Sequence, residues 1–328
     1  MSRAALARSE LVRRAALRLL GGVVLLFVLS VLTFGLVHLT PGNVVDNLLG
    51  TGRAAHDPAA RAAITARWHL QDSMWTQYWS WLGHAVRADW GSSIRQQRPV
   101  ASVLRESGSV TLQLVGLALV ISLALGIPLG VLSARRAGRA TDQVVAAVAV
   151  TGISAPAFAV SFVLIYLFGY LLRWLPLYGA GQGVLGRLEH LLLPALALSI
   201  GLAAYTLKVT RSVMRRELAQ DYVTAARARG WRERRVTTLG LRNGATPIVT
   251  STGLLVTYLL ANTILVEQSF ALPGLGRTLT DAVEFKDIAL VQGATLVVAT
   301  LIITVSIAAD LIAALLDPRS RTAGQGTL

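Results

Sequence analysis

The 328-residue chain contains 54% hydrophobic and 15% charged residues, and it has a mean hydropathy of +0.58 and a formal net charge of +14. So little polar surface excludes an ordinary soluble globule and indicates an integral membrane protein. The basic residues flank apolar runs and do not cluster with nucleic-acid motifs. We therefore attribute the charge to membrane topology and expect no nucleic-acid partner.

Residue types that are scarce exclude several chemistries. The chain has no cysteine, which excludes disulfides, thiolate nucleophiles and cysteine metal sites. Its lysines are Lys208 and Lys286, and the residues that follow them, Val209 and Asp287, do not complete a phosphate-binding loop of the form G-x-x-x-x-G-K-[ST]. The five histidines lack metal-ligand spacing. We expect no catalytic residue, no resident metal and no cofactor in this chain.

Six apolar segments are each long enough to cross a bilayer at 1.5 Å per residue. They are residues 19–39, 112–132, 144–172, 191–209, 248–266 and 290–316. The first segment is longer than a signal-peptide core and no cleavage site follows it, which favours a retained helix over a cleaved signal peptide. The predicted fold class is an all-α polytopic membrane protein with six transmembrane helices. The positive-inside bias of the short loops places both termini in the cytoplasm.

These spans define the expected domain organisation. It comprises a basic cytoplasmic N-terminus (1–18), the first transmembrane helix (19–39), an external helical domain (40–110), a five-helix core (111–316) with a cytoplasmic loop (210–246), and a cytoplasmic tail (317–328). The external helical domain is an insertion between the first two transmembrane helices.

An aromatic stripe at helical spacing marks the external domain, and its members are Trp75, Tyr78, Trp79, Leu82 and Val86. Such a stripe suits a helix that lies at the outer membrane interface. Packing of this small domain onto the helix bundle explains the stripe at least as well as direct contact with substrate.

Proline and acidic residues near the membrane provide further candidates. The third span requires tilt or a break, and Pro156, which follows Ser154, supplies a kink by removing a backbone donor. We consider a structural kink a simpler role for this pair than a pathway role. Asp310 lies within the sixth span, where a carboxylate needs a partner or a position near the inner end, so we favour a structural or interface role for it.

A further candidate region is the loop after the fifth span, which begins at Glu267 and contains the tight turn Pro273, Gly274 and Gly276. An acid at an external mouth can recognise a peptide amino terminus or a cation. Capping or anchoring of the loop is the simpler role for Glu267.

The cytoplasmic stretch 221–250 is basic and helix-forming. Asp221 is a candidate N-cap, residues 222–229 predict two helical turns, and Gly230 fits the left-handed position that ends a helix. A second basic helix then leads back to the membrane. With the small residues Ala225 and Ala226 on it, the first helix can sit in a groove of another protein, and binding to anionic lipid is the alternative.

At this stretch the sequence resembles the permeases of ATP-binding-cassette (ABC) importers, because TAARARG at 224–230 is similar to the motif of their coupling helix. The resemblance covers nearly the whole chain and points to the first-permease (B-type) branch of the dipeptide, oligopeptide and nickel family. It rests on TPG (40–42), WGSS (90–93), RPV (98–100), SAPAF (154–158), WLPLYG (174–179), HLLLPAL (190–196), DYVTAARARG (221–230), LRNGATP (241–247), EQSFALPGLG (267–276) and DLIAALLDPR (310–319). Thr224 departs from the general motif, which has Glu there, and the interval from Gly230 to Leu241 is about one residue shorter than is usual.

The resemblance implies a type I importer permease in the bacterial cytoplasmic membrane, in contact with membrane lipids. It implies partners as well: a second, similar permease, two ATPase subunits or a fused pair that bind ATP and Mg, and an extracytoplasmic binding protein or lipoprotein. The residues it assigns to the ATPase-docking helix are Asp221, Tyr222, Thr224, Ala225, Ala226, Arg229 and Gly230.

The function that we expect is import of di- or oligopeptides, driven by ATP hydrolysis on the separate subunits. Import of nickel or metal-chelate complexes by the same architecture is the alternative. A proton-coupled secondary transporter and a non-transporting membrane scaffold are the rival classes.

Overall fold

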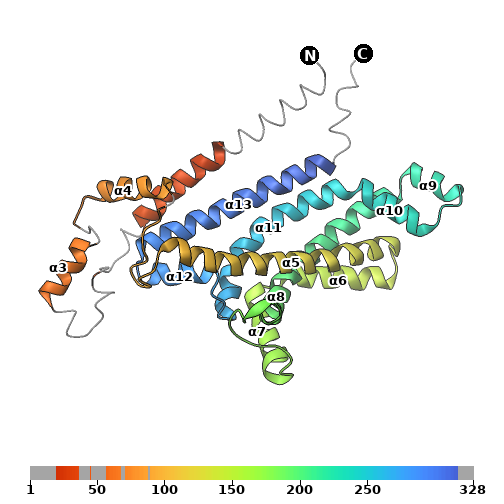
Figure 1. Cartoon of the computed structure of the whole chain (residues 1–328). Coiled ribbons are helices and arrows are strands. Elements are labelled where there is room, and N and C mark those ends of the chain that lie inside the picture. Colours follow the sequence, from red (N-terminus) through yellow and green to blue (C-terminus); the bar gives the residue numbers. More distant parts are fainter. Residues whose placement is uncertain (1–19, 37–44, 46–56, 68–70, 88, 317–328) are drawn as a thin grey trace, which may run out of the picture. The chain divides into compact units, whose positions relative to one another are not determined.

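The computed structural model describes residues 20–36, 45, 57–67, 71–87 and 89–316 (Figure 1). Across these ranges the chain forms no β-strand beyond an isolated bridge between Ser92 and Pro99. The all-α fold class is confirmed. The predicted N-terminus 1–18 and tail 317–328 lie outside the described residues, as does the side chain of Asp310.

The long helices follow the apolar segments of the sequence, and shorter helices lie between them. They are the helix Leu20–Leu36, α3 (Pro58–Arg67), α4 (Met74–Val86), α5 (Val100–Arg135), α6 (Ala140–Ser154), α7 (Ala157–Leu164) with the π-helix η2 (Ile165–Leu171), α8 (Gly183–Leu218), α9 (Asp221–Ala228), α10 (Glu233–Asn243), α11 (Ala245–Ser269), α12 (Leu275–Glu284) and α13 (Ile288–Leu316). Two helices begin well before the spans predicted from hydropathy, because α5 starts at Val100 and α8 at Gly183.

Among the described residues, three helices are individually long and apolar enough to cross a membrane: α5, α8 and the stretch Ile288–Ala309 of α13. Two bent helix pairs raise this number to at most five, if each pair counts as one span. The first pair is α6 with α7 and η2, and the chain bends by 103° between them. The second pair is the two halves of α11, with a bend of 47°. The helix Leu20–Leu36 is apolar but shorter within its described part. Six spans therefore remain a prediction.

The chain divides into two compact units, which we describe separately. The first unit comprises the described residues 112–272 and 302–316. Its central helix is α8, because 67% of the apolar 18-residue stretch of α8 is buried, against 33% for α5. Gly126 and Gly130 of α5 let the two helices approach closely. An added Cβ would lie 2.8 Å from the Ala203 carbonyl oxygen at Gly126 and 2.6 Å from Thr210 Cβ at Gly130. This is small-xxx-small packing of membrane helices.

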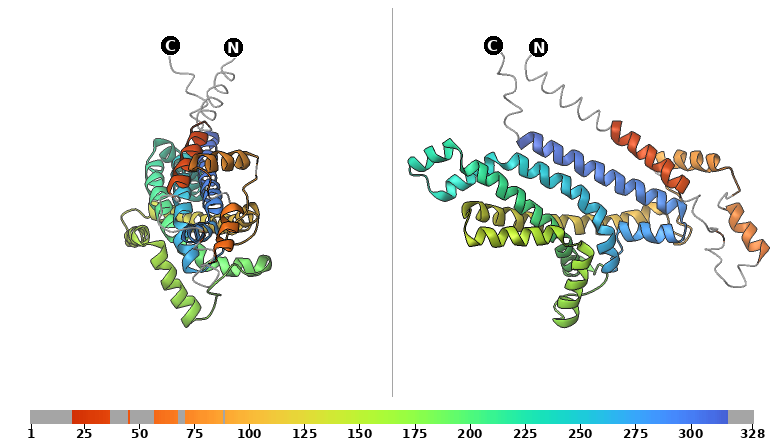
Figure 2. Two further views of the ribbon diagram at one scale, coloured as in Figure 1. Left: turned by 90° about the vertical axis from the view of Figure 1, so that its left-hand side faces the viewer. Right: turned by 180° about the vertical axis from the view of Figure 1, so that it is seen from behind.

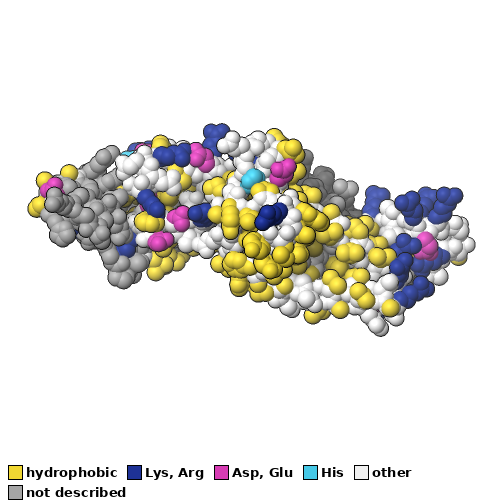
Figure 3. All heavy atoms as spheres, turned by 90° about the horizontal axis from the view of Figure 1, so that it is seen from below, with side chains coloured by type: hydrophobic (Ala, Val, Ile, Leu, Met, Phe, Trp, Pro, Cys, Tyr) yellow, Lys and Arg dark blue, Asp and Glu magenta, His cyan; other side chains and the backbone are white. Residues whose placement is uncertain are grey.

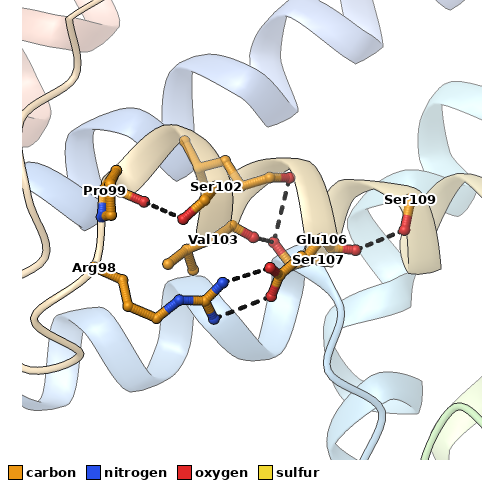
Figure 4. Close-up of polar contacts among 8 residues, drawn as sticks. Arg98, Pro99, Ser102, Val103, Glu106, Ser107 and Ser109 are labelled. Carbon is orange, nitrogen blue, oxygen red and sulfur yellow. Dashed lines mark hydrogen bonds and ion pairs between the residues drawn. The ribbon is translucent and has the colours of Figure 1, made fainter.

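The second unit contains described parts of 20–111 together with 273–301. Its core joins the start of α5 to α12 and α13 through Val100, Leu104, Leu275, Leu290 and Ala294. Figure 4 shows how the start of α5 is held. Arg98 forms a bidentate ion pair with Glu106, with Nη1–Oε2 at 3.1 Å. The hydroxyl of Ser102 donates to the carbonyl of Pro99, just before the helix, and those of Ser107 and Ser109 donate to backbone carbonyls within it. Local pairing of the polar groups lets α5 extend beyond its apolar part.

The WGSS and RPV motifs lie in the segment that precedes and begins α5, within this second unit. Ser93 Oγ donates to the Asp287 carboxylate at 2.5 Å, and the Arg95 backbone N–H donates to the same carboxylate at 3.3 Å. Asp287 also accepts from the Leu290 N–H at 3.3 Å and so caps the start of α13. The buried Asp287 therefore fixes the WGSS segment to the junction between α12 and α13.

Candidate functional site

The basic stretch 221–250 folds as α9, α10 and the start of α11, and α9 and α10 lie at the end of α8 and α11 that is remote from α7 (Figures 1 and 2). Asp221 is the first helical residue, and Gln220 occupies the N-cap, so Asp221 was wrongly placed at the cap by the sequence prediction. Its carboxylate still complements the positive end of the helix from the first turn.

Gly230 has the left-handed conformation that was predicted for it, with φ at +77°. Its N–H donates to the Arg227 carbonyl at 2.9 Å, and the next N–H, of Trp231, donates to the Ala226 carbonyl at 3.1 Å. This pair of bonds is a Schellman motif, which satisfies the last carbonyls of α9 and turns the chain sharply into α10.

A small core of its own holds the α9–α10 loop together. Val223 and Ala226 of α9 pack against Val236 of α10, with Leu218, Tyr222 and Trp231 around them. Ala226 is therefore buried inside the loop and does not share an outward face with Ala225. Thr224, Ala225, Arg229 and Gly230 are exposed. Amino-acid size alone could not distinguish the two alanines, but the burial of Val223, three residues before Ala226, gives the helical phase that separates them.

The loop is also packed firmly onto α8. An added Cβ on Gly244 would lie 2.5 Å from Val213 Cγ1, and one on Gly240 would lie 3.4 Å from Met214 Cε, so α10 approaches α8 closely at these two positions. Tyr222 donates its hydroxyl to Glu217 at 2.6 Å. Burial, followed by the neighbouring Glu217, raises the pKa of Tyr222 above its ordinary value, so the hydroxyl keeps its proton. The i, i+4 spacing of the glycines could have revealed this contact.

The exposed side of the loop is basic, and Figure 3 shows Lys and Arg side chains gathered there. The exposed arginines of the loop and the adjoining end of α8 are Arg215, Arg216, Arg227, Arg229, Arg232, Arg234, Arg235 and Arg242. One of them is paired within the loop: Arg227 Nε lies 2.9 Å from Glu233 Oε1, and its hydrogen bond holds the pKa of the Glu233 carboxyl below its usual value. The surface thus suits an acidic rim on a partner.

A buried ion pair ties α8 to the junction of α5 and α6. Arg211 of α8 reaches Asp142 of α6 through Nε at 2.6 Å and Nη2 at 2.9 Å. Asp142 also accepts from Ser133 Oγ at 2.5 Å and from the Gly138 N–H at 3.0 Å. Sequence reasoning missed this cluster because its members lie on three separate helices and a loop.

The break at Pro156 is far sharper than a kink. Pro156 is the N-cap of α7, and α7 leaves the line of α6 there (Figures 1 and 2). Ser154 Oγ donates to the Val150 carbonyl at 3.0 Å and so closes the end of α6. The bend follows from the missing N–H of proline, although its angle could not be deduced from the sequence.

A cavity of about 420 Å³ opens beside this break, within the first unit. Its lining comes from α6, α7, α8 and α11 and includes Ile153, Ser154, Pro156, Phe158, Leu198, Gly201, Leu202, Tyr205, Leu255, Leu259, Asn262 and Leu265. The polar members are Ser154, Tyr205 and Asn262. Ser154 and Pro156, the residues predicted to form the kink, therefore line a cavity whose size and mostly apolar lining are typical of small-molecule sites.

The residues predicted for the external mouth belong to different units. Glu267 lies in the last turn of α11 with a buried side chain, and its carbonyl accepts from the Leu272 N–H at 2.8 Å. In the second unit Pro273 precedes Gly274, the N-cap of α12, and Gly276 is buried in its first turn. Burial favours the anchoring role for Glu267. The PGLG sequence starts a helix, so its expected role as a loop turn was only partly correct.

Similarity to known proteins agrees with this architecture. The family described as binding-protein-dependent transport system inner membrane component matches residues 126–322, and the N-terminal region of such membrane components matches residues 11–114. A putative peptide permease protein of Brucella ovis is 37% identical over 309 residues, which cover 92% of this chain and 97% of the relative. A nickel import system permease protein of Staphylococcus aureus is 32% identical over 305 residues, which cover 93% of this chain and 90% of the relative.

The fold and these matches define a helical membrane component of an ABC importer. The chain belongs to the binding-protein-dependent transport system inner membrane component family and is an importer permease of the peptide and nickel type. Membership of this family implies ATPase and substrate-binding partners and a place in the inner membrane. It removes the proton-coupled secondary transporter and the non-transporting scaffold as explanations.

Proposed function

We propose that this permease imports di- or oligopeptides across the bacterial cytoplasmic membrane, with both of its termini in the cytoplasm. The similarity to a protein named as a peptide permease over 92% of the chain carries the choice of cargo. The cavity beside Pro156 supports it. Among the described residues that line the cavity there is no acid and no histidine, whereas Ser154, Tyr205 and Asn262 offer hydrogen-bonding groups suited to a peptide backbone.

The exposed face of α9 is the proposed docking site for an ATPase subunit. Thr224, Ala225 and Arg229 lie on the outside of a loop that has its own core and is packed on α8. A rigid loop of this kind transmits a push from the ATPase to the membrane helices as a displacement, without absorbing it by local rearrangement. The proposed assembly includes a second, similar permease, two ATPase subunits or a fused pair, and an extracytoplasmic binding protein.

Ala225→Asp tests the docking site. It places a charge on the proposed contact without entering the core of the loop. Burial of this charge against the partner should reduce co-purification of the ATPase by at least about tenfold, the effect of about 1.4 kcal/mol. Ala137→Asp is the matched control, because Ala137 is an exposed alanine of the basic loop between α5 and α6. Equal recovery of the ATPase with the two variants would contradict the assignment of α9.

Cargo is tested separately by uptake of a labelled dipeptide into cells that express the complete importer. Excess unlabelled di- and oligopeptides should compete, and nickel with or without a chelator should not. The alternative, import of nickel or a metal chelate, is favoured by the similarity to the nickel import permease at 32% identity. Competition by the chelated metal alone would establish this alternative and reject peptide cargo.

A further inference from the structure

Helix α4 of the second unit leaves part of its apolar surface uncovered. Tyr78 is only 2% exposed, whereas Trp75, Trp79 and Val86 are 69%, 57% and 80% exposed. At 3.6 residues per turn, these three exposed side chains fall within about 40° of one another, and Tyr78 lies about 60° to one side of Trp75. The protein therefore covers one half of a continuous apolar sector and leaves the other half open.

The opposite side of α4 is polar. Thr76 and Ser80 are exposed and lie about 100° and about 140° from Trp75 on the side away from Tyr78. No acid, lysine or arginine occurs between Met74 and Val86. The helix is thus divided into a part that the protein covers, an uncovered apolar strip and an uncharged polar face.

The covered part of α4 packs against the helix of the predicted first span. Tyr78 Oη and Ser30 Oγ are hydrogen-bonded at 2.9 Å, and the Tyr78 ring meets the Phe34 ring edge-on, with centroids 5.4 Å apart. Ser30 and Phe34 belong to the apolar helix Leu20–Leu36, whose exposed side chains include Leu32 and Leu36. The helix against which α4 packs is therefore apolar, has exposed apolar side chains of its own, and belongs to the first span predicted from the sequence.

This contact lies in the C-terminal half of the helix Leu20–Leu36. At 1.5 Å per residue, Ser30 lies about 9 Å and Phe34 about 3 Å before Leu36, the last described residue of that helix. Amphipathic helices in the membrane interface bury their apolar faces about 5–10 Å deep. Tyr78 thus contacts the helix of the predicted first span at a distance from its described end that matches this depth.

We propose that α4 lies in the lipid–water interface at the C-terminal end of the helix Leu20–Leu36, with Trp75, Trp79 and Val86 inserted between the lipid head groups and acyl chains. Lipid fits this strip because tryptophan places an apolar ring and a polar N–H together, which is the combination that the interface favours. The uncharged polar face meets water. This contact is independent of cargo and of ATPase docking, and it fixes the external segment against the membrane.

Site-directed spin labelling tests the proposal directly, since the chain has no cysteine of its own. Trp75→Cys, Trp79→Cys and Val86→Cys are each labelled in the assembled importer in phospholipid nanodiscs. Thr76→Cys, on the polar face of the same helix, is the matched control. The accessibility of each label is measured with oxygen, which concentrates in the bilayer, and with chromium oxalate, which stays in water.

We expect the ratio of oxygen to chromium oxalate accessibility to be several-fold higher at positions 75, 79 and 86 than at position 76. A ratio as low at the three apolar positions as at the control would show that the strip faces water and would overturn the proposal. Low accessibility to both reagents would show that a protein partner covers the strip and would overturn it too. Val86→Cys keeps the test valid if loss of a tryptophan impairs folding, because this side chain is almost free of contacts.

Discussion

Asp142→Asn should destabilise the helix bundle although the side chain keeps its shape. The carboxylate of Asp142 accepts two hydrogen bonds from Arg211, one from Ser133 and one from the Gly138 N–H. An amide loses the charge and presents a donor where acceptors are needed, so Arg211 retains an uncompensated charge. Breaking a buried pair in this way costs about 3–5 kcal/mol. We expect about 3 kcal/mol, because the side chain of Arg211 is 27% exposed and that of Asp142 only 5%.

The free energy of unfolding of the purified permease, measured by titration with a denaturing detergent, tests this value. Glu233→Gln is the matched control, since it makes the same carboxylate-to-amide change in a pair whose side chains are 44% and 51% exposed. Water screens that pair, so no measurable loss is expected. Adding Arg211→Met to Asp142→Asn should recover part of the loss, because the orphaned charge is then removed. Equal stability of Asp142→Asn and the wild type would refute the reasoning.

Three further predictions follow from positions where the backbone or the packing leaves little choice. Gly230→Val should destabilise the α9–α10 loop by about 1–2 kcal/mol, because Gly230 has a left-handed backbone, and it should weaken recovery of the ATPase. Gly230→Asn should have smaller effects. Co-purification of the ATPase measures the two variants, and equal effects would reject the role of φ. Gly130→Leu should abolish the close packing of α5 on α8, and with it the yield of folded permease in size-exclusion chromatography. Gly116→Leu should not, because nothing lies within 4 Å of a Cβ added at Gly116. Equal yields would contradict the close approach. Pro156→Ala should let α6 continue into α7 and reduce peptide uptake while the ATPase still co-purifies; unchanged uptake would exclude the break as a requirement for transport.

The sequence predicted those features that depend on local chemistry. Apolar runs located the long apolar helices, a glycine after TAARAR identified the end of α9, and Pro156 identified the break in the third apolar segment. Each of these follows from one residue type or from the period of a few neighbours. The start of α5 at Val100 was missed because hydropathy does not register the Arg98–Glu106 pair that supports a polar helical turn.

Features that depend on which residues meet in space could not be predicted. Asp142 and Arg211 lie 69 positions apart, and neither position is unusual by itself. The burial of Ala226 depends on Val236, which belongs to another helix. Alanine suits both a partner surface and a small core, so composition left both interpretations open until the contacts of α9 were known.

The route from the proposed docking site to the proposed pathway runs through a single helix. Tyr205 of α8 lines the cavity, Arg211 holds the α5–α6 junction, and Glu217 binds Tyr222 at the loop. The three positions span about 18 Å along a continuous α-helix. We expect a helix of this length, held at Arg211 and Glu217, to move as a rigid body, so that displacement of α9 also displaces the cavity wall and the start of α6. Asp142 and Arg211 join α6, the helix that precedes the break, to the same moving element, so weakening that pair should impair coupling even where docking is intact.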